Sequence, residues 1–502
     1  MTFSNPAFFL FFLPLSLVGF QIFGRLGRRG AIGFLALMSF AFYAEWRMPY
    51  LILLVSSILF NYVISLLLTR YAGRERVQTS CLVFGIVTNL AGLIYFKYLF
   101  PVLSFFTAHR LSHHDWGSVV LPLGISFFTF TQIAYLVDLK QGVAGRESLL
   151  SYSLFVTFFP HLIAGPIIHH KEMMPQFREE RRYKLNRDDM ALGLTWFTMG
   201  LFKKVMIADR ISPIADTFFG HSQGIGIIQA WVGVLAYSLQ LYFDFSGYSD
   251  MAVGLARMFS IRFPYNFNSP YKAASIIDFW QRWHMTLTRY ILDYVYGPIQ
   301  LWVSRRRLDK GKKISKKAMA TPEGFTVMVA LPTLITMFLA GVWHGAGKTF
   351  LVFGLLHGFY LVINHAWRIF VPHDSGLQKP LITPVNIGIT YLAVVIAEVF
   401  FRAISLRDAV TIVGDLLGQH GLGSERSLSQ TLVVAAFLAV IWAMPNTQEL
   451  LGEARRDDAA NWSILPQLRW HPTFAWWVAT CAAFSISMFY STANSTFLYF
   501  QF

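Results

Sequence analysis

The sequence predicts an all-α, multi-pass integral membrane protein. Of its 502 residues, 55% are hydrophobic and 17% are aromatic, whereas only 14% are charged. Apolar runs recur along the whole chain, and a helix needs about 20 residues to cross the hydrocarbon core of a bilayer. Allowing for short and broken runs, we expect about 11 to 13 membrane segments. Because no repeat, low-complexity tract or soluble segment interrupts them, we expect one membrane-embedded domain over residues 1–502.

The charge pattern of the first segments predicts an N-terminus outside the cytoplasm. The first apolar run, Phe8–Phe23, is followed by Arg25–Arg29 and lacks a small-residue cleavage site, which favours a retained span over a signal peptide. Two further runs, 31–44 and 50–68, lead to a second basic loop at Arg70–Arg76. Clustered basic residues stay on the cytoplasmic side of a membrane, so we place both basic loops there.

Two of the following runs are predicted to contain broken or re-entrant helices. Val119–Val137 includes Pro122 and Gly124, and Leu149–Ile168 contains two prolines. Proline removes a backbone donor, so neighbouring protein must supply the missing hydrogen bonds. The second run is therefore expected to be buried. Apolar runs resume later at Met190–Ile207, Gln229–Phe243, Phe325–Trp343, Phe350–Phe370, Leu381–Val399, Leu428–Ile441 and Phe474–Phe489.

The formal net charge of +15 sits in short loops between apolar runs, which argues against a nucleic-acid partner. Lys171–Arg187 is predicted to be a charged loop, and Arg305–Lys317 holds eight basic residues and one acid. The simpler interpretation is that both loops fix the topology by staying in the cytoplasm. A second interpretation is that Arg305–Lys317 also attracts an anionic cytosolic partner, such as coenzyme A phosphates or an acidic carrier protein.

The cysteines and the adjacent histidines predict no metal site. Cys81 and Cys481 lie in apolar segments without ligand spacing, so neither a disulfide nor a thiolate site is expected. The pairs His113–His114 and His169–His170 lack the carboxylate or cysteine spacing of a metal centre. We therefore interpret both pairs as polar loop histidines.

Polar residues gather among aromatics between Tyr242 and His284. The string Tyr-Phe-Asp-Phe-Ser-Gly-Tyr-Ser-Asp contains Asp244 and Asp250, and Pro-Tyr-Asn-Phe-Asn-Ser-Pro contains Asn266. A charged side chain next to lipid costs free energy, so such residues by default line a protein-walled cavity and indicate function.

A third string, Asp-Phe-Trp-Gln-Arg-Trp-His, is predicted to be helical. Ser275 and Asp278 have the spacing of a helix N-terminal capping box. The helix would carry the other polar and aromatic members of the string: Trp280, Arg282, Trp283 and His284. Trp280 and His284 would then share a face, and Asp278 would pair with Arg282 four residues on. A structural pair is at least as well supported as a catalytic one.

The fourth string, Gly-Val-Trp-His-Gly-Ala-Gly, ends an apolar run with Trp343 and His344 between glycines. Glycine allows the helix to break and the backbone to approach a ligand. A neutral imidazole at such a place can accept a proton near pH 7. On the next run, His357, Asn364 and His365 are either packing residues or a second layer around the site.

In this order the four strings resemble the membrane-bound O-acyltransferase family, and its bacterial polysaccharide branch in particular. The resemblance covers about residues 101–364 and extends to the ending Phe497–Phe502. It implies helices around a central tunnel, through which an acyl group from a cytoplasmic thioester reaches an acceptor outside. His344 matches the essential histidine of the family, and His284 matches a second histidine near the tunnel. We therefore expect His344 to act as general base and His284 to orient a substrate.

The resemblance implies an acetyltransferase of the bacterial inner membrane that works without a metal. We expect acetyl coenzyme A as the donor, a polysaccharide of the alginate or cellulose type as the acceptor, periplasmic acetyltransferases as partners, and lipid around the protein. Transfer to teichoic acid, peptidoglycan or a lipid is the alternative within the family. A secondary transporter is the alternative outside it, because broken helices and buried charges also occur in substrate pathways.

Overall fold

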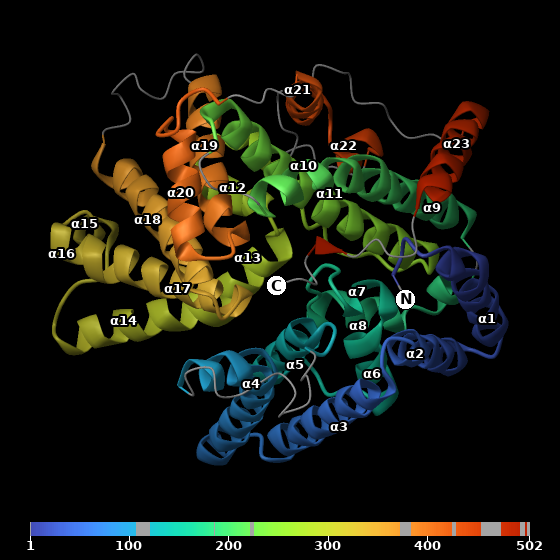
Figure 1. The fold of residues 1–502 in the computed structure, drawn as a ribbon. Helices are drawn as coiled ribbons and strands as arrows, with labels where there is room; N and C mark the ends of the chain where they lie inside the picture. Colours follow the sequence, from blue (N-terminus) through green and yellow to red (C-terminus); the bar gives the residue numbers. More distant parts are fainter. Residues whose placement is uncertain are drawn as a thin grey trace. The chain divides into compact units, whose positions relative to one another are not determined.

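The structure is a computed structural model that describes residues 2–106, 121–184, 186–220, 225–371, 383–423, 428–452, 473–491 and 497–498. These residues form helices and connecting loops and no strand, so the all-α prediction is confirmed (Figure 1). The chain divides into two compact units. Unit 1 comprises Met1–Met206, Gly247–Tyr265 and Pro472–Gln501, and unit 2 comprises Ile207–Ser246 and Asn266–His471. The expectation of one domain stays a prediction.

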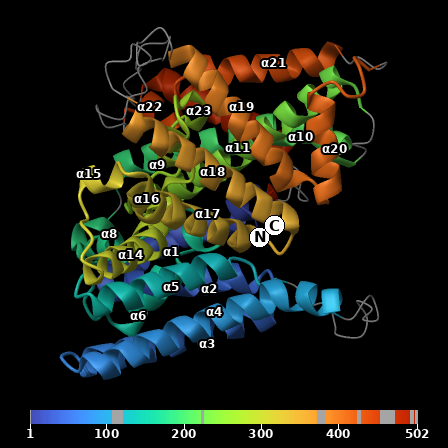
Figure 2. The same cartoon turned by 90° about the vertical axis from the view of Figure 1, so that its left-hand side faces the viewer.

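Unit 1 begins with helices packed through aromatic rings. Its elements are η1 (Phe8–Phe12), α1 (Leu13–Arg25), α2 (Arg28–Ala44), α3 (Met48–Arg70), α4 (Glu75–Phe106), α5 (Ile125–Lys140), α6 (Leu149–Thr157), α7 (Phe159–Leu162), α8 (His170–Arg178), η2 (Glu180–Tyr183), α9 (Arg187–Phe202), α23 (Phe474–Tyr490) and η3 (Lys203–Ala208), whose last two residues belong to unit 2. Helices α3, α4 and α5 run side by side (Figure 2). The ring of Phe42 lies 5.4 Å from that of Phe12 and 5.6 Å from that of Phe159.

Both predicted helix breaks of unit 1 are confirmed. Helix α5 begins only after Gly124, whose φ of +70° is a conformation that favours glycine. The run at 149–168 splits into α6 and α7 at Phe158 and is buried throughout from Ser151. The Phe159 N–H donates to the Ser39 hydroxyl over 3.1 Å, so a neighbouring helix supplies the hydrogen bond that the break removes.

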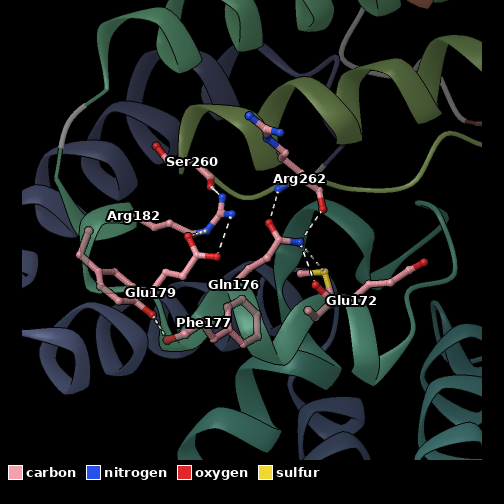
Figure 3. A network of polar contacts seen from close by, with 9 residues as sticks. Glu172, Gln176, Phe177, Glu179, Arg182, Ser260 and Arg262 are labelled. Atoms are coloured by element: carbon pink, nitrogen blue, oxygen red, sulfur yellow. Dashed lines mark hydrogen bonds and ion pairs between the residues drawn. The ribbon is translucent and has the colours of Figure 1, made fainter. Parts of the chain in front are cut away.

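The segment 171–187, predicted to be a loop, is largely helical. Helix α8 occupies His170–Arg178 and buries Met173, Met174 and Phe177 on one side, a helical spacing that its charged residues obscured. Figure 3 shows how α8 is held: the Gln176 amide donates to the Arg262 carbonyl over 2.9 Å and accepts from the Arg262 N–H over 2.8 Å. Helix α8 is therefore held in place by the backbone of Arg262.

Unit 2 contains the third and fourth strings. Its elements are α10 (Asp209–Gly220), η4 (Pro270–Lys272), α12 (Ile276–Arg282), α13 (Met285–Ile291), η5 (Leu292–Tyr296), α14 (Gly297–Asp309), α15 (Lys316–Met319), α16 (Pro322–Phe325), η6 (Thr326–Ala330), α17 (Leu331–His344), α18 (Lys348–Phe370), α19 (Thr383–Arg402), α20 (Leu406–Leu416), α21 (Leu428–Ala443) and α22 (Thr447–Leu450). Helix α11 (Ile227–Met258) carries the first string and contributes to both units.

Helices α17 and α18 cross closely because two glycines meet. A Cβ on Gly354 would lie 2.4 Å from the Met337 carbonyl oxygen, and a Cβ on Gly341 would lie 2.5 Å from the Phe350 carbonyl oxygen. Small residues let membrane helices approach to this distance. Gly354 and Gly341 are therefore the residues that permit this close crossing.

Seven helical segments of the described chain are long and apolar enough to cross a membrane: Phe8–Arg25, Met48–Arg70, Glu75–Leu99, Arg187–Gly220, Pro322–His344, Lys348–Phe370 and Thr383–Arg402. Helices α21 and α23 are shorter apolar candidates. The multi-pass prediction is thus confirmed. The expected number of about 11 to 13 segments and the tunnel stay predictions.

The basic segment 305–317 is only partly a loop. Helix α14 continues to Asp309 and α15 begins at Lys316. Arg307 and Lys312 both bond to Glu323, Arg307 over 3.4 Å, which ties the basic segment to the first turn of the span that starts at Pro322. This position next to a span accords with a loop at the membrane surface.

Candidate active site

Asp244 and Asp250, the two acids of the first string, lie in different surroundings. Asp250, in unit 1, forms a 2.6 Å ion pair with Lys203. Asp244, in unit 2, is buried with 2% of its surface exposed. The pairing of Asp250 explains how a charge is accommodated among aromatics, and it makes this residue structural in its contacts.

Asn266 and Asn268 hold the third string by backbone pairing. The Asn268 N–H donates to the Arg282 carbonyl over 2.9 Å, and the Met285 N–H donates to the Asn266 carbonyl over 2.9 Å. These two bonds bracket Trp283 and His284. The second string therefore fixes the backbone on both sides of the histidine.

Helix α12 starts as predicted but ends earlier. The Ser275 hydroxyl accepts from the Asp278 N–H over 3.2 Å, which confirms the N-cap. The helix stops at Arg282, and His284 adopts the left-handed conformation with φ of +43°. The expectation that Trp280 and His284 share a helix face is wrong, because the Arg282 carbonyl bonds to Asn268 instead of continuing the helix. Such a backbone costs on the order of 1 kcal/mol and is found at functional sites.

Asp278 and Arg282 form the predicted pair, with Nε 2.7 Å from Oδ1. The other carboxylate oxygen of Asp278 accepts from the Ala274 N–H over 3.1 Å, and an Arg282 Nη1–H reaches the Asn268 carbonyl over 3.4 Å. Both charged groups are thus used to hold the local backbone. The contacts support the structural interpretation of the pair.

The His284 imidazole is buried between a polar clamp and an aromatic ring. Its Nδ1 lies 2.9 Å from Asn266 Oδ1, which also accepts from the Thr286 hydroxyl over 2.9 Å and from the Thr286 N–H over 3.4 Å. The Phe245 ring packs edge-on against the imidazole at 4.7 Å between centroids. Burial lowers the pKa of His284 to about 3, so the ring is neutral at physiological pH.

Stacked aromatics continue from this clamp. The Trp283 ring lies 5.0 Å from that of Phe267 and 5.7 Å from that of Phe279, to which it is nearly parallel. Trp280 turns towards His357, with ring centroids 5.1 Å apart. The third string is therefore packed against α18 through rings rather than through charges.

His344 ends α17, as predicted, and Gly345 continues in an extended conformation. Its half-buried imidazole is surrounded by aromatic rings: Trp343 at 4.6 Å, Phe401 at 5.0 Å and Phe353 at 5.7 Å between centroids. Phe353 also contacts His357 at 4.7 Å. His344 and the third string thus belong to one aromatic cluster of unit 2, with His357 between them.

Three residues of this cluster were not identified from the sequence as site residues. Thr286 and Phe245 acquire their place only through the turn at His284. Glu398, on α19, is a buried acid that bonds to the Tyr271 hydroxyl over 3.0 Å. A single acid inside an apolar run was the signal that would have identified Glu398.

The histidine pair at 169–170 is buried, so its interpretation as polar loop histidines is wrong. His170 Nε2 lies 3.5 Å from Glu147, whose carboxylate also bonds to Arg178. Burial raises the pKa of Glu147, but these two partners outweigh it and hold that pKa below its usual value. The pair His113–His114 lies outside the described residues.

No group of three or more histidine, cysteine or acidic side chains is placed to hold a metal ion in the described part of the chain. A cavity of about 250 Å³ lies between α3, α4 and α5 of unit 1 and contains none of the predicted site residues. The chemistry-bearing cluster of unit 2 is therefore the candidate active site.

Comparison with known proteins identifies the family. The model of the membrane-bound O-acyltransferase family matches residues 30–313, more than half of the chain. A peptidoglycan O-acetyltransferase of Helicobacter pylori is 38% identical over 452 residues, which cover 84% of this chain and 81% of that protein. A probable alginate O-acetylase of Pseudomonas aeruginosa is 37% identical over 414 residues, 82% of this chain and 73% of that protein.

A teichoic acid D-alanyltransferase of Bacillus subtilis is 28% identical over 341 residues, which cover 66% of this chain and 78% of that protein. The range matched by the family model includes Asn266 and His284, whereas His344 lies beyond its end. The resemblance of the four strings is confirmed: the chain is an enzyme and a multi-pass membrane protein of the membrane-bound O-acyltransferase family.

Proposed function

We propose that this O-acyltransferase moves acetyl groups from cytoplasmic acetyl coenzyme A across the inner membrane for O-acetylation of an extracytoplasmic polysaccharide. The observation that carries the proposal is the buried, neutral His284, clamped through one ring nitrogen in the same aromatic cluster as His344. Two imidazoles among aromatics suit transfer to a hydroxyl, which is a weak nucleophile until its proton is removed.

The reaction moves one proton in total, from the hydroxyl to the leaving sulfur, and needs no redox partner. The hydroxyl O–H bond breaks, a bond forms between that oxygen and the acetyl carbon, and the C–S bond of the thioester breaks. The proton ends on the sulfur of coenzyme A. We propose His344 and His284 as the catalytic residues. The proposed supporting residues are Asp244, Asp250, Asn266, Asp278, Trp280, Arg282, Trp283 and Trp343.

The basic segment supports a polyanionic donor. Lys310, Lys313, Lys316 and Lys317 are exposed, while Arg307 and Lys312 are occupied by Glu323. Exposed cations raise the local concentration of an anion such as the phosphates of coenzyme A. On the positive-inside rule this segment faces the cytoplasm, where acetyl coenzyme A is found.

The acceptor is proposed from the relatives. Two of them are named for O-acetylation of peptidoglycan and of alginate, both hydroxyl-bearing glycans. We propose an exopolysaccharide of the alginate or cellulose type, reached with the help of periplasmic acetyltransferases. Peptidoglycan is the alternative acceptor, and the more distant teichoic acid relative supports D-alanyl transfer less.

The test is acetyl transfer by the purified protein in proteoliposomes supplied with acetyl-labelled acetyl coenzyme A on the side of the basic segment. Alginate, acetyl-free cellulose and peptidoglycan fragments would be offered on the other side, each with and without the periplasmic acetyltransferases. We expect label in covalent O-acetyl esters, released by mild alkali. Passage of an unchanged substrate without ester formation would instead indicate a transporter and overturn the proposal.

A further inference from the structure

The hydrogen-bond pattern around His284 fixes which ring nitrogen carries the hydrogen. The atom of Asn266 that faces His284 Nδ1 also accepts from the backbone N–H of Thr286, which can only donate. That atom is therefore the amide oxygen, and an oxygen of this kind only accepts. His284 Nδ1 must accordingly be the donor.

A neutral imidazole has one donor and one acceptor nitrogen. With its hydrogen on Nδ1, His284 presents the lone pair of Nε2. This nitrogen is buried and has no hydrogen-bond partner among the described residues. A buried acceptor without a partner costs stability and calls for a functional explanation.

The backbone at His284 is also in a conformation that costs stability. His284, Ser269 and Ser260 are the three residues other than glycine with positive φ in the described chain, and Ser269 and His284 flank the backbone pairing of the second and third strings. Strain that the surrounding structure holds in place is typical of residues placed for chemistry. The hydrogen bonds to Asn266 and the strained backbone together orient Nε2 of His284, and the strained backbone reduces the stability of the fold.

We propose that Asn266 is the positioning residue of the active site: it holds His284 as the Nδ1–H tautomer, so that Nε2 takes the proton of the hydroxyl that receives the acetyl group. This inference rests on the proposed function. It assigns proton removal to His284 rather than to His344, which is the reverse of the expectation from the sequence. His344 is then assigned to the acetyl thioester.

The step balances without a further reactant. The substrate O–H donates to Nε2, and its proton moves to Nε2 as the oxygen bonds to the acetyl carbon. The thiolate released by C–S cleavage then takes this proton and returns the ring to its neutral form. Because neighbouring side chains cover Nε2, the substrate reaches it only when they shift; the Phe245 ring is one neighbour.

The test compares three variants in single-turnover acetyl transfer over a range of pH. Asn266→Ala removes the acceptor of the Nδ1 hydrogen, and we expect transfer to fall by about 100-fold. Asn266→Asp keeps an acceptor there, so we expect most of the rate to return. Asn268→Ala is the matched control, because its side chain accepts from Asn446 rather than from His284.

The pH profile distinguishes positioning from packing. A carboxylate beside Nδ1 stabilises the imidazolium and raises the pKa of His284, by about 1–3 pH units. Transfer needs the neutral ring, so the rate of Asn266→Asp is lost as pH falls through the raised pKa, and its acid limb lies at higher pH than that of wild type. If Asn266→Ala does not fold, this profile alone carries the test. An Asn266→Asp protein as slow as Asn266→Ala, or one with an unshifted profile, would overturn the proposal.

A second readout is independent of activity. In protein labelled with ¹⁵N only in histidine rings, the signals of His284 are those lost in His284→Gln. We expect a protonated Nδ1 and an unprotonated Nε2 at neutral pH. The opposite tautomer or a charged ring overturns the role of Asn266. Absence of any acetyl transfer by wild type, with the tautomer as expected, would instead contradict the proposed function.

Discussion

Trp283-His284 and Trp343-His344 are the same dipeptide at the end of a helix, but their surroundings differ. His284 is held by a polar clamp, and its backbone is forced into the left-handed region. His344 is the last residue of α17 and contacts three aromatic rings. The ring of His284 is thus fixed by Asn266, 18 positions away in the chain, and His344 is placed by the end of its helix.

The difference shows which contacts hold each of the two histidines in position. The position of His344 depends on the close crossing of α17 and α18, whereas the ring of His284 depends on one amide oxygen and its donors. Changes at the crossing should therefore move His344 and leave the tautomer of His284 intact. Changes at the clamp should do the opposite.

Among changes to the surroundings of the two histidines, the largest effect is expected from Gly354→Ala. The new methyl group would lie 2.4 Å from the Met337 carbonyl oxygen, so α17 and α18 must separate and His344 must move. Overpacking of this kind costs about 1–3 kcal/mol, and misplacement by about 1 Å costs about 100-fold in rate. Single-turnover transfer and thermal stability measure the two effects.

Gly388→Ala is the control for this variant, because a Cβ there meets nothing within 4 Å. We expect its rate and stability to stay close to those of wild type. An unchanged rate in Gly354→Ala would show that the crossing does not position His344. A changed ¹⁵N signal of His284 in that variant would show that the two histidines are not independently held.

A smaller effect is expected from Thr286→Val. This change removes the 2.9 Å hydroxyl donor to Asn266 Oδ1 but keeps the backbone donor and the shape of the side chain. The loss of one buried hydrogen bond is worth about 1 kcal/mol, or about fivefold in rate. Thr288→Val serves as the comparison, because its hydroxyl makes only a 3.4 Å contact with the Trp283 carbonyl. Equal rates for the two variants would remove Thr286 from the clamp.

The smallest effect is expected at the basic segment, for which no contact with His284 or His344 is described. Replacing Lys310, Lys313, Lys316 and Lys317 by alanine should raise the KM for acetyl coenzyme A about threefold at low salt, with little change at high salt. Acetyl-pantetheine, which lacks the phosphates, is the control donor and should be unaffected. An equal change with both donors would leave these lysines a role in topology only.

Sequence reasoning predicted the features that depend on local chemistry. The apolar runs predicted a multi-pass helical protein, Ser275 predicted the start of α12, and the glycines around His344 predicted the end of α17. The prolines and Gly124 predicted the breaks in unit 1. Each of these depends on residues within one or two turns of the chain.

Features that depend on distant partners were not predicted. The stop of α12 at Arg282 results from a bond to Asn268, and the burial of His170 results from packing against Tyr135 and Glu147. Helix α8 was missed because its charges concealed the spacing of its apolar residues. A sequence pattern does not show which distant residue will become a contact partner once the chain has folded.

The most direct test of the central claim is single-turnover acetyl transfer by purified wild type, His284→Ala and His344→Ala, with thermal stability as the check on folding. If these two histidines carry the reaction, each folded variant should transfer acetyl at least about 100-fold more slowly than wild type. Binding of acetyl coenzyme A should remain nearly unchanged in His284→Ala, because its ring is assigned to the hydroxyl. A folded variant of either histidine that transfers acetyl at the wild-type rate would contradict the account.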